Sequence, residues 1–171
     1  MIEEKEMGKE RGFAEGLIAA VSIGGFLVLV GIIFVINQNL LQKINDFFND
    51  FNTVQLPNTT LNVPAPLTPA AHTAVYSATF QFALGIAILQ ILILALRLGL
   101  GSRIRRTAGT VGSLVFWFGA AYLLNNLAQM SSTLSQNQQY VLWFQFWAAI
   151  IALIGVSLVI RGAIVFLARR R

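Results

Sequence analysis

The sequence has no cysteine, which excludes disulfide bonds, iron–sulfur clusters and thiol nucleophiles. Charged residues are also scarce, since Asp, Glu, Lys and Arg make up 11% of the chain whereas soluble domains contain about 25%. Hydrophobic residues make up 56%, and the mean hydropathy is +0.70. A soluble protein of 171 residues could not bury this much apolar surface, so the composition predicts an integral membrane protein.

Titratable side chains are missing from the middle of every long apolar stretch. Proton relays and metal sites in a membrane need such groups close together. The single histidine, His72, is predicted to be an exposed loop residue, and neither a Ser/His/Asp set nor a Gly-rich phosphate loop can be identified. We therefore expect no catalytic residues, no metal site and no cofactor, and we predict that the protein is not an enzyme.

Four apolar stretches remain, each long enough to cross a bilayer. The first covers residues 13–36, and its 24 residues would form a helix of roughly 36 Å against a hydrocarbon core of about 30 Å. The other three are residues 74–96, 109–127 and 140–167. The sequence thus predicts an all-α, polytopic membrane protein, with four transmembrane helices packed as a bundle and both termini on one side.

The stretch that begins at Tyr76 and ends at Arg97 occurs twice in the chain. When residues 76–106 are aligned with residues 140–170, 64 residues further on, 10 of the 31 positions are identical. We interpret this as an internal repeat, in which two tandem helical hairpins of the same orientation form a parallel pair. The identities include Tyr76/Tyr140, Phe80/Phe144, Gln81/Gln145, Phe82/Phe146 and Arg97/Arg161.

The repeat divides the chain into inner segments and two hairpins. Residues 1–12 are a charged inner segment, and residues 97–108 are a basic inner turn. The first transmembrane hairpin covers residues 13–96 and contains a long outer loop, residues 37–73. The second hairpin covers residues 109–171, with a short outer loop and a basic C-terminus.

Basic residues determine the predicted orientation. With the termini and the turn at 97–108 inside, 11 of the 12 Lys and Arg residues lie on the inner side, and only Lys43 lies outside. This asymmetry is typical of membrane proteins that follow the positive-inside rule. The charges therefore favour membrane orientation over nucleic-acid binding, and we predict a cell-membrane protein with cytoplasmic termini.

The outer loop has an amphipathic part, residues 37–51, and a proline-rich part, residues 52–73. The proline-rich part holds all four prolines and none of the 14 glycines, which predicts an extended, polyproline-like segment. Asn58 begins an N-glycosylation acceptor pattern, Asn-Thr-Thr. The amphipathic part is interpreted as a helix in the headgroup region or at the end of the first span, or alternatively as a surface that docks a partner. Its apolar face contains the candidate docking residues Leu40, Ile44, Phe47, Phe48 and Phe51.

Six amide side chains are predicted to lie at similar depth in the outer half of the membrane. One interpretation is that they form hydrogen bonds between helices, and the other is that they line a polar vestibule for a neutral solute, an ion or a cofactor tail. These candidates are Asn37, Gln81, Asn125, Asn126, Gln129 and Gln145.

Three charged residues lie near the predicted inner boundary: Glu15, Arg97 and Arg161. The two arginines are expected to reach lipid headgroups with their long side chains, or to bind an anionic lipid together. A third interpretation is an ion pair between Arg161 and Glu15.

Small residues at helical spacing, such as Gly16, Ala20 and Gly24, allow membrane helices to approach closely. The leading hypothesis is therefore a non-catalytic structural or accessory subunit of a membrane assembly. Its expected partners are the bilayer and other transmembrane chains or a second copy, with no nucleic acid. The alternatives are a small channel or carrier lined by the amides and a membrane protein that binds anionic lipid.

Overall fold

The computed structural model describes the backbone of residues 2–169 and the side chains of residues 12–169. The described chain is mostly helical, and four of its helices are long and apolar enough to cross a membrane, which confirms a mainly helical fold and the number of candidate spans. These helices are α1 (Ile2–Ile36), α3 (Thr73–Gly99), α4 (Ile104–Ala128) and α5 (Gln136–Arg169).

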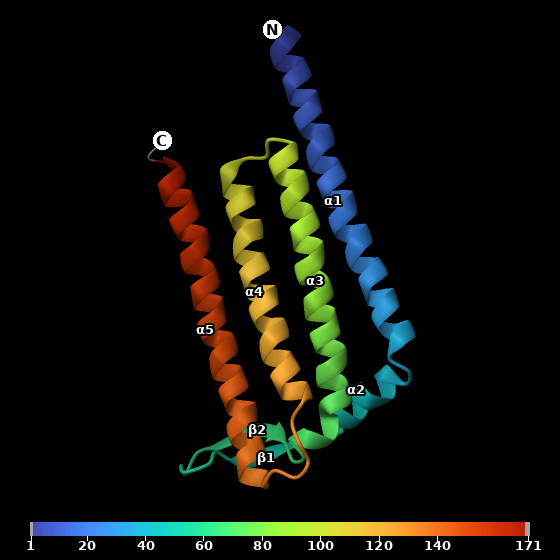
Figure 1. Cartoon of the computed structure of the whole chain (residues 1–171), viewed down its shortest axis with the longest axis vertical. Helices are drawn as coiled ribbons and strands as arrows, with labels where there is room; N and C mark the ends of the chain where they lie inside the picture. The colour runs from blue at the N-terminus through green and yellow to red at the C-terminus, as the bar shows by residue number, and fades with distance from the viewer. Residues whose placement is uncertain (1, 170–171) are drawn as a thin grey trace.

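The four long helices lie side by side in the order α1, α3, α4, α5 (Figure 1). The most extensive contact joins α3 to α4, the next joins α4 to α5, and a smaller contact joins α1 to α3. The packing is bundle-like but open, because α1 and α5 form the two edges of the layer. Each edge helix therefore has one long face that the described part of the chain leaves uncovered.

The two ends of this layer differ in structure. The start of α1, the end of α5 and the α3–α4 connection lie at one end, which we call the basic end (Figure 1). At the opposite end lie the shorter elements between α1 and α3 (Figure 1). We call residues 37–72 the cap; its elements are α2 (Leu40–Asn49), β1 (Phe51–Gln55), β2 (Asn62–Pro66) and the short helix η1 (Pro69–His72).

Glycines on one span receive leucine side chains from the next span. A Cβ added to Gly25 on α1 would lie 2.6 Å from a methyl carbon of Leu89 on α3. A Cβ added to Gly119 on α4 would likewise lie 2.6 Å from a methyl carbon of Leu153 on α5. Because glycine has no side chain, the helices approach closely at these points, and packing offsets the weak helix propensity of glycine.

Strands β1 and β2 form an antiparallel hairpin, so the predicted polyproline-like structure is wrong for this part of the chain. The hydrogen bond from Leu67 N to Asp50 O, 2.9 Å long, identifies these two residues as a hydrogen-bonded pair. By the alternation of an antiparallel ladder, Pro66 and Pro64 lie at positions whose nitrogen points away from β1. Proline therefore removes no ladder hydrogen bond here, and an exposed two-stranded sheet tolerates it.

An aromatic cluster joins the cap to the spans. Trp143 on α5 is 3% exposed. Its ring lies against Phe47 and Phe51 of the cap and against Tyr76 of α3, with centroids 6.1, 6.2 and 5.9 Å away. Aromatic pairs of this geometry contribute roughly 0.5–1.5 kcal/mol each beyond the area that they bury. The cluster thus fixes the cap against both α3 and α5.

Candidate functional site

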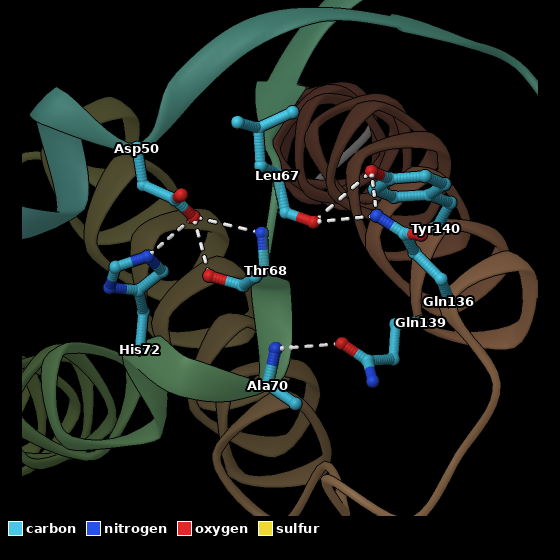
Figure 2. A network of polar contacts seen from close by, with 8 residues as sticks. All are labelled: Asp50, Leu67, Thr68, Ala70, His72, Gln136, Gln139 and Tyr140. Carbon is cyan, nitrogen blue, oxygen red and sulfur yellow. Dashed lines mark hydrogen bonds and ion pairs between the residues drawn. The ribbon is translucent and has the colours of Figure 1, made fainter.

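One carboxylate holds three parts of the cap together. Asp50 directly follows α2, and its Oδ2 atom accepts hydrogen bonds from the backbone nitrogen and the hydroxyl of Thr68, both at 2.9 Å. The same oxygen accepts a hydrogen bond of 2.8 Å from Nε2 of His72 (Figure 2). Because an ionised carboxylate only accepts, Nε2 of His72 carries the hydrogen. This one oxygen atom therefore joins three parts of the cap: the end of α2, Thr68 after β2, and the helix η1.

The surroundings of Asp50 favour its charged form. The side chain is 19% exposed, and this burial alone would raise the pKa. The hydrogen bonds from Thr68 and His72, together with the charge interaction with His72, outweigh burial and lower the pKa of Asp50 below its ordinary value. The carboxylate is thus ionised at neutral pH and accepts all three hydrogen bonds.

The segment after β2 is also bound to the first turns of α5. The hydroxyl of Tyr140 and Nε2 of Gln136 both donate to the carbonyl oxygen of Leu67, each at 3.1 Å (Figure 2). The backbone nitrogen of Ala70 donates to Oε1 of Gln139 at 3.1 Å. These bonds satisfy the carbonyl of Leu67, which follows β2, and a backbone N–H in the first turn of η1, where a helix offers no acceptor of its own. The cap is therefore held by the carboxylate on one side and by α5 on the other.

The prediction of an exposed His72 is wrong. The residue is 8% exposed, and its ring meets the edge of the Phe47 ring with centroids 5.2 Å apart. A polar ring buried in this way needs a hydrogen-bond partner, which Asp50 provides. His72 is thus a buried structural residue of the cap rather than an exposed loop residue without a structural role.

Replacement of Asp50 by alanine is expected to destabilise the protein by about 2 kcal/mol, because the donors of Thr68 and His72 lose their acceptor. The effect should appear as a lower unfolding midpoint in detergent, measured by tryptophan fluorescence. The pKa of Asp50 is lower in the folded protein than in the unfolded chain. The part of its contribution that depends on ionisation is therefore present at neutral pH and is lost as the pH falls below about 4, so the difference between the variant and the wild type should become smaller in acid.

Asp46→Ala is the matched control for this experiment. It removes the same charge from α2, but the Asp46 side chain is exposed and forms no hydrogen bond or ion pair within the described residues. We expect a change of less than about 0.5 kcal/mol for the control. Equal losses for the two variants, or a difference that is as large in acid as at neutral pH, would contradict the role assigned to Asp50.

Most of the five candidate docking residues, which lie on α2 and just after it, pack against residues of the same chain. Leu40 and Ile44 pack in a cluster formed by α1, α2 and α3. Phe47 and Phe51 belong to the aromatic cluster described above. Phe48 is 66% exposed. The predicted amphipathic helix is present, and most of its apolar face packs against other parts of the same chain.

Two residues of the predicted amide layer form a direct hydrogen bond. Nδ2 of Asn37, which follows α1, donates to Oε1 of Gln81 on α3 at 2.8 Å. The same amide also donates to the carbonyl oxygen of Ile33 at 3.0 Å. This pair agrees with the interpretation that the amides link helices.

Two of the other four amides lie between α4 and α5. Asn126 and Gln145 are exposed and line an open groove of 200 Å³ between these helices. Asn125 is half-buried on α4, and Gln129 is exposed at the C-terminal cap of that helix. The predicted layer is thus not continuous: one pair links α1 to α3, a second pair lies at the α4–α5 groove, and Asn125 and Gln129 are placed only on α4 and at its end.

Asn58 lies in the turn between β1 and β2. It is exposed, and its φ of 62° is in the left-handed region, which asparagine adopts more readily than most residues. The turn and the start of α5 form an open depression of 650 Å³. The acceptor pattern therefore lies on an accessible surface.

Glu15 forms an ion pair at the basic end, with Arg106 rather than with the predicted Arg161; the N–O distance is 2.5 Å. Both side chains are about half exposed, and such pairs contribute about 0–1 kcal/mol. Arg97 lies on α3 and Arg161 on α5, so α4 separates the two helices. The Nε atom of Arg97 is buried and has no hydrogen-bond partner within the described residues.

Among the residues whose side chains are described, no group of three His, Cys, Asp or Glu residues lies close enough to hold a metal ion. Comparison of the chain with known protein families, with curated proteins and with solved structures finds no match. The function is therefore argued from the geometry alone.

Proposed function

We propose that the protein is a non-catalytic structural or accessory subunit of a membrane assembly, which packs against transmembrane helices of partner chains or of a second copy. The supporting observation is a set of glycines on the uncovered edges of the layer. A Cβ added to any of them would meet no neighbouring atom of the described residues within 4 Å. These residues are Gly16, Gly24 and Gly31 on α1, and Gly155 and Gly162 on α5.

Glycine at these positions is explained by close helix contact rather than by lipid. Each glycine costs a helix about 1 kcal/mol relative to alanine, and a lipid-facing surface gains nothing in return. Small residues are instead typical of membrane helix interfaces, where they let two backbones approach. The seven-residue spacing of Gly24 and Gly31, and of Gly155 and Gly162, puts each pair on one helix face. The edges of the layer are therefore suited to further helices.

The amides between α4 and α5 support the same proposal. Asn126 and Gln145 are exposed and form no side-chain hydrogen bond within the described residues. Polar side chains of this kind form interhelical hydrogen bonds worth about 0.6–2 kcal/mol. A partner helix along this groove would supply the missing donors and acceptors.

The proposal includes two tandem hairpins of related structure. Leu89 and Leu153 occupy equivalent positions of the sequence repeat. Each packs against a glycine of the span that precedes it, Gly25 in one case and Gly119 in the other. The equivalent leucines support a duplicated hairpin, in which the cap is the main difference between the copies, although the glycines that they meet are not at equivalent positions.

We also propose that the basic end is cytoplasmic and that the cap lies outside the cell. The positive-inside rule supports this orientation, because Lys43 is the only basic residue of the cap. The outer surface would then carry the Asp50 network and the Asn58 turn. A cell-membrane location follows from the same reasoning.

The distribution of the amides favours a subunit over a channel. A vestibule would require the amides to face one continuous space, whereas Asn37 and Gln81 bond to each other at the α1–α3 contact. Asn126 and Gln145 line a different groove, at the α4–α5 contact. The amides thus favour two separate helix contacts over a single polar path through the bundle.

Purification from the native membrane in mild detergent is expected to recover a complex larger than the monomer. Gly155→Leu should release the protein from that complex, because the leucine side chain occupies the space of the approaching helix. Gly99→Leu is the control, since Gly99 also lies in open space on a helix but outside the α1 and α5 edges. Size and composition of the complex can be read by native mass spectrometry.

A monomer in every detergent and lipid condition would overturn the proposed subunit role. Retention of the complex by Gly155→Leu would move the interface away from α5. In that case Gly24→Leu tests the α1 edge with the same control.

A further inference from the structure

An apolar groove lies where the cap meets α1 and α3. It has a volume of 390 Å³. Ile33 and Phe34 line it from α1, and Ile44 and Phe48 line it from α2. On α3 it is lined by residues that include Thr79. The groove therefore opens beside the bilayer at the end of two spans.

The groove has no free polar group. Thr79 is its only lining residue with a polar side chain, and that hydroxyl donates to the carbonyl oxygen of Val75 at 2.8 Å. A ligand with buried donors or acceptors would lose its hydrogen bonds to water without replacement. The chemistry of the groove thus admits hydrocarbon and excludes polar solutes.

The size of the groove matches a single acyl chain. A water molecule occupies about 30 Å³, and a methylene group is of similar size, so 390 Å³ holds on the order of a dozen methylene groups. An acyl chain is therefore the occupant that fits.

A cation lies beside the groove. Lys43 is exposed on α2, three residues after Leu40 and four before Phe47, which both line the groove. Residues at these spacings are neighbours on a helix surface, so Lys43 borders the apolar face. Within the described residues Lys43 forms no ion pair with an acidic side chain. Its ammonium group is thus free to meet a phosphate at the membrane surface.

We propose that this groove binds one acyl chain of a phospholipid from the leaflet at the cap end, with Lys43 meeting the phosphate of the headgroup. The site is independent of the proposed subunit role, because it uses residues of one chain only. It explains why α2 lies across α1 and α3 with Phe48 still exposed. The lipid fills the remaining apolar space between the three helices.

The test uses the purified full-length protein in vesicles of phosphatidylglycerol that carry a photoreactive diazirine on one acyl chain. Cross-links, mapped by proteolysis and mass spectrometry, are expected to concentrate on α2 and on the adjoining ends of α1 and α3. Thr79→Trp should reduce this labelling at least fivefold, because the indole fills the groove. Ile88→Trp is the matched control on an exposed position of α3 outside the groove, and it should leave the labelling unchanged. Thr79→Phe replaces Thr79→Trp if the larger variant does not fold.

The headgroup contact has its own readout. Lys43→Gln should lower groove labelling by phosphatidylglycerol about fivefold, the effect of one basic residue near an anionic surface. Labelling spread evenly over the exposed faces of α1 and α5, and unaffected by Thr79→Trp, would overturn the proposal. Because the chain has no cysteine, Thr79→Cys gives a further check. Disulfide-linked dimers or adducts with another chain through this cysteine would mean that protein occupies the groove, which also overturns it.

Discussion

Replacement of Gly112 by leucine is expected to separate α4 from α5 and to destabilise the protein by roughly 3 kcal/mol. A Cβ at this position would lie 3.0 Å from the carbonyl oxygen of Ser157 and 3.4 Å from Cβ of Arg161. The first of these atoms belongs to the backbone of α5 and cannot rotate away. The remaining leucine atoms therefore fit only if the whole helix moves. The loss can be measured as a lower unfolding midpoint in detergent micelles.

Other glycines at helix contacts are less sensitive for a physical reason. Gly25 and Gly119 face the ends of flexible leucine side chains, which can change rotamer when a methyl group is added. Gly112 instead faces a peptide group. We therefore expect Gly112→Ala to cost more than Gly25→Ala, although both contacts look similar in sequence.

Gly99→Leu is the control for the Gly112 experiment. It makes the same chemical change on α3, where no neighbouring atom lies within 4 Å. We expect a change of less than about 1 kcal/mol, in the stabilising direction if helix propensity dominates. A large loss in Gly99→Leu, or none in Gly112→Leu, would show that close α4–α5 packing does not determine stability.

The spans could be predicted because the bilayer fixes their length and composition. A helix must cross about 30 Å of hydrocarbon, so hydropathy alone locates it to within a few residues. The predicted second span, 74–96, corresponds to α3, Thr73–Gly99. The order of the four helices in the layer could not be predicted in the same way, because an apolar helix face can contact either lipid or protein. That α1 touches α3 and leaves its other face open could not be derived from hydropathy.

The β-hairpin was not predicted, because the prolines of residues 52–73 were considered by their number and not by their spacing. Composition favours an extended segment without hydrogen bonds when prolines are frequent. The informative feature is the two-residue spacing of Pro64 and Pro66, which puts both at positions where no ladder hydrogen bond is needed. Spacing, rather than number, makes the prolines compatible with a strand.

The Asp50 network depends on that hairpin and was missed with it. Asp50 and His72 are 22 residues apart in sequence, and only the antiparallel pairing of β1 and β2 brings them together. A signal was nevertheless present, since Asp50 is one of only two acidic residues in the cap and His72 is the only histidine of the chain. Rare charged groups in a loop that must fold near a membrane are candidates for pairing. The apolar residues of α2 recur at helical spacing, which predicted an amphipathic helix. This spacing shows which face of the helix is apolar, but it does not show what covers that face.

Replacement of Arg103, Arg105 and Arg106 together by alanine is expected to convert a single membrane orientation into a mixture. These residues hold the turn between α3 and α4 on the cytoplasmic side in the orientation that we propose. Basic residues in short loops close to the span ends determine orientation, so removal of three of them makes the opposite orientation accessible. The variant also loses the ion pair from Arg106 to Glu15, which is too exposed to decide the result.

The cysteine-free sequence makes the orientation directly measurable. A cysteine at Thr60 in the turn of the hairpin and, in a separate protein, a cysteine at Gly99 report the two ends of the layer. In intact cells, an impermeant maleimide should label Thr60→Cys and not Gly99→Cys while the three arginines are present. With three alanines, both cysteines should be labelled in part, whereas a triple lysine variant should restore the original pattern because it keeps the charge. Unchanged labelling in the alanine variant would show that the apolar spans and the folded cap determine orientation without the basic turn.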